Sequence, residues 1–136
     1  MNETLDVVRR VLLVILLIGL AGMTTELLLL KHDEDPAQFI PLALIGVAVV
    51  SIAWHALDRG TASLRFFQTT MVLFIVAGVV GMYLHFRASV EFQREVDPAI
   101  VGRELVVKAM TAKTPPALAP GSMSQLGLIG LAYAYR

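Results

Sequence analysis

Residues 11–30 read VLLVILLIGLAGMTTELLLL, and this stretch decides the fold class. A helix needs about 20 mostly apolar residues to cross roughly 30 Å of hydrocarbon. The run has that length, and Glu26 is its only charged residue. We therefore predict a transmembrane helix here, and not the buried helix of a water-soluble domain.

Two further runs follow the same pattern. Residues 39–56 read FIPLALIGVAVVSIAWHA and residues 66–86 read FFQTTMVLFIVAGVVGMYLHF, and neither contains Asp, Glu, Lys or Arg. The chain of 136 residues is 57% hydrophobic and only 16% charged, which is more apolar than a typical soluble domain. The sequence therefore predicts an all-α integral membrane protein with three transmembrane helices.

The charge balance and the absence of cysteine exclude several classes of function. Eleven basic residues offset eleven acidic ones, so no basic surface for nucleic acid is expected. The chain has no cysteine, which excludes disulfides, thiolate metal sites and cysteine catalysis. We find no nucleotide-binding loop and no hydrolase or metalloprotease motif, so we expect no enzyme.

The connections between the apolar runs are too short to cross a membrane, so consecutive spans must be antiparallel. We expect the third helix to project beyond the lipid to about Val96. We divide the chain into a three-helix transmembrane unit at 1–96 and an amphipathic helix at 97–113. A proline-rich linker and an apolar tail form 114–136. Charged side chains at helical spacing support the projecting part of the third helix; they are Arg87, Glu91, Arg94 and Glu95.

The last third of the chain contains one amphipathic pattern and one short apolar segment. Asp97 and Pro98 predict an N-cap and a first-turn proline, with a helix from Pro98 to about Thr111 that lies on the membrane interface or against a partner. Residues 114–122 contain three prolines and predict a linker. The tail at 123–135 is too short to span, so we expect it to be re-entrant, interfacial or docked onto another subunit.

Arginines near the spans favour an orientation with the N-terminus in the cytoplasm. Arg9, Arg10, Arg59 and Arg65 would then be cytoplasmic, as the positive-inside rule requires. Four basic residues on the other side balance this count, namely Lys31, Arg87, Arg94 and Arg103. The preference therefore rests on the freer translocation of long C-terminal segments. We expect a bacterial inner membrane.

Glu26 is the residue most suited to carry chemistry, because ionisable groups inside a span are costly and usually face a bundle interior or a polar partner. One interpretation is an ion or proton relay, or a countercharge for a cofactor. The other is a carboxylate that reaches the nearby surface or bonds to Thr24 or Gln68.

The three histidines divide between the two membrane faces. His32 and His85 lie at span ends on one face, and His55 lies on the other. Glu26, His32 and His85 are therefore candidate metal ligands, since imidazole and carboxylate suit zinc, copper or iron. His85 and His55 are candidate cofactor ligands for a haem or a chlorin. The alternative for each is an amphipathic residue at the interface.

Small residues in the spans predict faces where another helix approaches closely. They are Gly19 and Gly22 in the first span, Gly46 in the second, and Ala77, Gly78 and Gly81 in the third.

Three spans enclose little of a pathway, so we place function in assembly. Our first hypothesis is a non-catalytic accessory subunit of a larger membrane complex, photosynthetic or respiratory. It would have other membrane subunits and lipids as partners, and no cofactor of its own beyond lipid, pigment or haem contacts. The second hypothesis is a homo-oligomeric transport or binding module that uses Glu26. The third is a haem or metal redox protein that uses His32 and His85.

Overall fold

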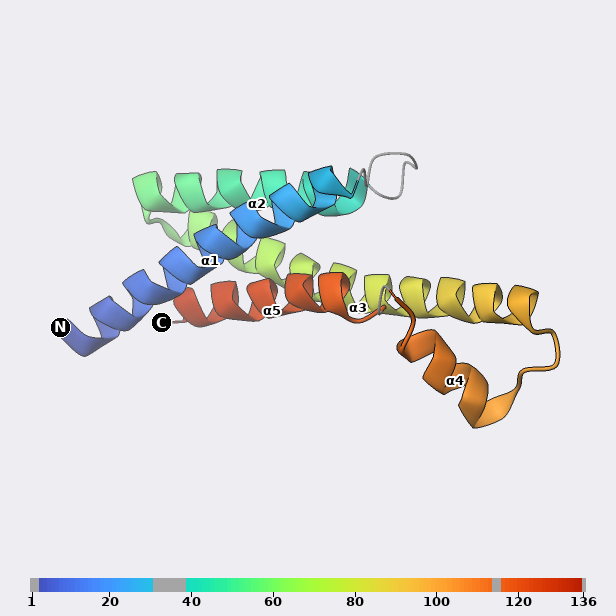
Figure 1. Cartoon of the computed structure of the whole chain (residues 1–136). Coiled ribbons are helices and arrows are strands. Elements are labelled where there is room, and N and C mark those ends of the chain that lie inside the picture. The colour runs from blue at the N-terminus through green and yellow to red at the C-terminus, as the bar shows by residue number, and fades with distance from the viewer. Residues whose placement is uncertain (1–2, 31–38, 114–115, 136) are drawn as a thin grey trace.

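The computed structural model describes residues 3–30, 39–113 and 116–135, and this part of the chain is all-helical (Figure 1). Helices account for 88% of the described residues, which confirms the predicted all-α class. The five helices are α1 (Glu3–Leu29), α2 (Phe39–Asp58), α3 (Thr61–Val96), α4 (Gly102–Met110) and α5 (Leu118–Tyr133).

Helices α1, α2 and α3 are long and apolar enough to cross a membrane, as the three apolar runs predicted. They alternate in direction along the bundle (Figure 1). With 36 residues, α3 is about 54 Å long at about 1.5 Å per residue, well beyond the roughly 30 Å of hydrocarbon. Its predicted end at Val96 is confirmed, and its last turns project past the other long helices.

Helix α5 lies along α3 and α1 and runs antiparallel to both (Figure 1). The sequence-based division treated this segment as a linker and a tail outside the three-helix unit, whereas the structure makes it a packed part of the bundle. The helix begins at Leu118, so Pro120 falls in its first turn, where a missing backbone N–H leaves no bond unmade. The predicted linker is therefore shorter than 114–122, and α5 is about 24 Å long.

The core of the molecule lies where α5 meets α1 and α3. Four side chains in this core are fully buried: Phe67, Met71 and Phe74 of α3, and Leu16 of α1. The largest helix contact is between α3 and α5, and α2 packs mainly against α3. Other members of the same cluster are Leu20, Met23, Leu27, Ile45, Ala48, Met123, Leu126 and Ala134.

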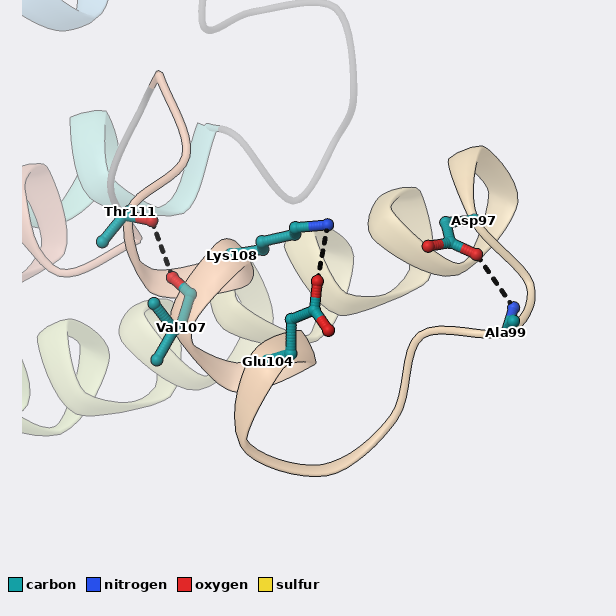
Figure 2. A network of polar contacts seen from close by, with 6 residues as sticks. All are labelled: Asp97, Ala99, Glu104, Val107, Lys108 and Thr111. Atoms are coloured by element: carbon teal, nitrogen blue, oxygen red, sulfur yellow. Dashed lines mark hydrogen bonds and ion pairs between the residues drawn. The ribbon is translucent and has the colours of Figure 1, made fainter.

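Helix α4 folds back against the projecting end of α3 (Figures 1 and 2). Its apolar side is buried through Leu105 and Ala109, while Glu104 and Lys108 form an ion pair of 3.0 Å on the exposed side. The predicted amphipathic helix therefore exists, and it covers α3.

The turn between α3 and α4 differs from the predicted N-cap. The Asp97 carboxylate accepts a hydrogen bond from the Ala99 N–H at 3.1 Å, which closes a local turn instead of capping a helix (Figure 2). Helix α4 begins only at Gly102, which has a φ of 62°. Glycine adopts this left-handed conformation without the steric cost that a β-carbon imposes.

Candidate functional site

An apolar cavity of about 450 Å³ lies among the end of α1, the middle of α3 and the start of α5. Three side chains that can carry charge line it together with the apolar residues: Glu26, His85 and Lys113. The remaining lining residues are Met23, Leu27, Leu30, Pro41, Ala77, Gly81, Leu118, Ala119, Pro120 and Met123.

Helical spacing explains how α1 and α3 bring their side chains to this cavity. On α3, Ala77, Gly81 and His85 are four residues apart and therefore share one face. On α1, Met23 lies three residues before Glu26 and is buried, which holds the exposed carboxylate beside the cavity. The structure thus brings Glu26 and His85 to one place, the end of the bundle at which the topology predicted that they share a membrane face.

Lys113 reaches the cavity from the segment that follows α4. Sequence reasoning did not single it out, because its position depends on α4 folding back along α3. Its ammonium adds a positive charge to a lining that otherwise contains one carboxylate and one imidazole.

A second hollow, of about 390 Å³, lies between α1 and α5 and shares Met23 and Glu26 with the first. Ile15 and Ile18 line it from α1, and Ile129 lines it from α5. The polar groups of its lining are Glu26 on the α1 wall and Ser122 and Gln125 on the α5 wall. The two hollows therefore meet at Glu26, and the second continues along the apolar part of α1.

The predicted metal site is only partly described. His32 lies outside the described residues, and Glu26 and His85 supply one carboxylate and one imidazole to the cavity. Within residues 3–30, 39–113 and 116–135, no group of three or more His, Cys, Asp or Glu side chains is placed to hold a metal ion.

His55 lies at the opposite end of the bundle, in contacts that join three helices. Its Nδ1 is 3.1 Å from the Ser63 Oγ, and its ring stacks on Phe67 with centroids 6.4 Å apart. Phe67 in turn meets Tyr133 of α5 edge to face at 5.7 Å. Because the Ser63 hydroxyl donates to the Gly60 carbonyl, we assign the proton to Nδ1, which donates to Ser63. His55 thus ties α2 to α3 and, through Phe67, to α5.

The small residues predicted to allow close helix packing fall into two groups, those that contact α5 and those that do not. A β-carbon added at Gly19 would clash with Leu126, one at Gly78 would clash with Ser124, and Gly81 lies close to Pro120. These three glycines therefore let α5 approach α1 and α3. Ala77 faces the cavity. At Gly22 and Gly46, an added β-carbon would meet no atom of the described chain within 4 Å.

The small residues of α5 that allow its close approach to α3 were missed by sequence reasoning. A β-carbon at Gly127 would lie 2.6 Å from the Met71 carbonyl oxygen, and one at Gly130 would clash with the Met71 side chain. The Ser124 hydroxyl also donates to the Ile75 carbonyl of α3 at 3.2 Å. The signal that could have revealed this face is a small residue at every third position, namely Gly121, Ser124, Gly127 and Gly130.

The arrangement suits the binding of a molecule that is part apolar and part charged. The walls offer apolar side chains, and the polar groups at one end include a carboxylate and an ammonium. Comparison with known protein families, curated proteins and solved structures gives no match to this chain, so its function is argued from the geometry of the site.

Proposed function

We propose that this chain is a non-catalytic membrane protein that binds an amphipathic ligand in the cavity between α1, α3 and α5. Small-molecule sites are usually concave and mostly apolar, have a few convergent polar groups, and measure about 300–1,000 Å³. The cavity has a volume of about 450 Å³ and fits this description. The observation that carries the proposal is the meeting of Glu26, His85 and Lys113 at one apolar cavity.

The position of the cavity along the spans supports an amphipathic ligand. Glu26 is four residues from the end of the first apolar run, and His85 is one residue from the end of the third. Charged groups at that depth are near the level of lipid headgroups, whereas Met23 and Ala77 extend the lining towards the hydrocarbon. A ligand with a polar head and an apolar body matches both parts of the lining.

Adjacent leucines offer a matched pair of variants for testing this proposal. Leu30 lines the cavity and Leu29 does not, although both are exposed. The chain would be purified from native membranes in mild detergent, and the small molecules that elute with it would be identified by mass spectrometry. We expect a stoichiometric ligand with the wild type and with Leu29→Trp, and a loss of it with Leu30→Trp. A wild-type chain that purifies without any ligand would contradict the proposal.

A second candidate function is that of an accessory subunit in a larger complex of the bacterial inner membrane, respiratory or photosynthetic. It is favoured by the uncovered surface of the spans, since only 17% of the most apolar window of α1, and the same share of α2, is buried. Gly22 and Gly46 lie on such uncovered faces, where a partner helix has room to approach.

This second function has its own test, which uses the same gentle purification. Unlike subunits that elute with the chain would support it, and a visible spectrum of the peak would detect a haem or pigment among them. Gly46→Leu should abolish co-purification without lowering the stability of the isolated chain. Val47→Leu, at an exposed position about 100° further around the same helix, should leave co-purification unchanged. A chain that elutes alone would contradict the accessory role.

A further inference from the structure

We call the two adjoining hollows together the groove, which starts at the charged cavity and follows α1 towards the middle of its span. They share Met23 and Glu26, and the second extends as far as Ile15 and Ile129. The eleven steps along the helix from Glu26 back to Ile15 rise about 16 Å, roughly half of the hydrocarbon thickness. The groove therefore has a polar end at headgroup level and an apolar length comparable to one leaflet.

The charges at the polar end have opposite signs. Glu26 supplies a carboxylate and Lys113 an ammonium, with His85 lining the same cavity. A headgroup that carries both an amine and a phosphate can pair its amine with Glu26 and its phosphate with Lys113. A purely anionic headgroup would leave the Glu26 carboxylate beside a negative charge, which costs binding energy.

We propose that the groove binds a zwitterionic aminophospholipid, with its headgroup at Glu26 and Lys113 and one acyl chain between α1 and α5 along Ile18 and Ile129. This inference rests on the proposed ligand-binding function and specifies the class of ligand. The apolar isoleucines of α1 suit the acyl chain, while Ser122 and Gln125 on the α5 wall lie nearer the glycerol and headgroup region than Ile129 does.

The test uses the delipidated full chain and two lipids with identical acyl chains, a phosphatidylethanolamine and a phosphatidylglycerol. Native mass spectrometry would measure the fraction of chain that retains each lipid as the lipid is titrated. We expect the wild type to prefer the phosphatidylethanolamine by about tenfold or more, as the loss of one hydrogen bond to a charged group implies.

Each part of the proposed site has a variant and a matched control. Glu26→Gln should remove the preference while Glu26→Asp and the distal Glu95→Gln keep it. Lys113→Gln should weaken retention of the phosphatidylethanolamine about tenfold, whereas Lys108→Gln on α4 should not. In the groove, Ile18→Trp should displace the lipid, and Val14→Trp should not, because Val14 is exposed outside either lining.

Two outcomes would overturn the inference, and they separate it from the proposed function. Equal retention of both lipids, unchanged by Glu26→Gln but lost in Ile18→Trp, would contradict the headgroup assignment and leave ligand binding in place. Retention of neither lipid, together with the absence of any ligand in the native purification, would overturn both.

Discussion

The guanidinium of Arg9 in α1 donates a hydrogen bond to the Tyr135 carbonyl oxygen at 2.7 Å, joining residues 126 positions apart. Beside it, the Gln68 amide of α3 donates to the Ala134 carbonyl at 3.5 Å. The last carbonyls of a helix have no partner within the helix, and a positive charge is favoured at that end. The C-terminal end of α5 is therefore capped by side chains of both helices against which it packs.

This cap predicts that Arg9→Gln lowers the free energy of unfolding of the chain by about 0.5–1 kcal/mol, because an exposed hydrogen bond to a charged group and its favourable charge are both lost. Unfolding would be followed by circular dichroism as a denaturing detergent replaces a mild one. Arg10→Gln is the matched control, since the Arg10 side chain makes no hydrogen bond within the described residues, and it should have the stability of the wild type. Equal effects of the two substitutions would contradict the cap.

The contact between α3 and α5 predicts different costs for the same substitution at two glycines. Gly127→Ala should destabilise the chain by about 1–3 kcal/mol, because its β-carbon would lie 2.6 Å from the Met71 carbonyl oxygen and force the helices apart. Gly46→Ala should be neutral or stabilising by up to about 1 kcal/mol, because space is open there and alanine favours a helix. The same unfolding measurement compares them, and a Gly127→Ala variant as stable as the wild type would rule out the close packing.

The three long helices could be predicted from the sequence because apolar length alone specifies them. The end of α3 at Val96 followed from the charged residues at helical spacing and from Asp97-Pro98 after them. The shared location of Glu26 and His85 also followed, because short connections force antiparallel spans and thus assign each span end to a face.

Helix α5 could not be predicted in the same way. Its apolar stretch is too short to span a membrane and its first turn contains a proline, so the sequence suggested a tail. The helix is instead stabilised by packing against α1 and α3, which no local sequence pattern encodes. Lys113 was missed for a related reason: α4 must fold back before Lys113 can reach the cavity. The three-residue spacing of Gly127, Gly130 and their small neighbours was present in the sequence, but it gains meaning only when the opposing glycines of α3 are known.

The hydrogen bond between His55 and Ser63 predicts that Ser63→Ala costs about 1–2 kcal/mol of stability. Ser63 is fully buried, so its loss leaves the His55 Nδ1–H without this acceptor. Thr25→Ala is a suitable control, because the Thr25 hydroxyl is exposed and bonds only to the Ala21 carbonyl of its own helix. The unfolding assay again gives the measurement, and a Ser63→Ala variant no less stable than Thr25→Ala would show that the bond contributes nothing.

The antiparallel packing of α5 predicts that the C-terminal end of α5 lies on the same membrane face as the start of α1. Because the chain has no cysteine, single cysteines at exposed positions can be labelled with a membrane-impermeant maleimide. We expect Leu5→Cys, Leu57→Cys and Tyr135→Cys to react from one side and Val101→Cys from the other, with Val101→Cys labelled in intact cells if the N-terminus is cytoplasmic. Leu5→Cys and Leu57→Cys lie on one face by the topology of α1 and α2 alone, so they calibrate the assay. If α5 instead lay on the interface beside α4, Tyr135→Cys would react together with Val101→Cys, and the bundle position of α5 would be wrong for the protein in its membrane.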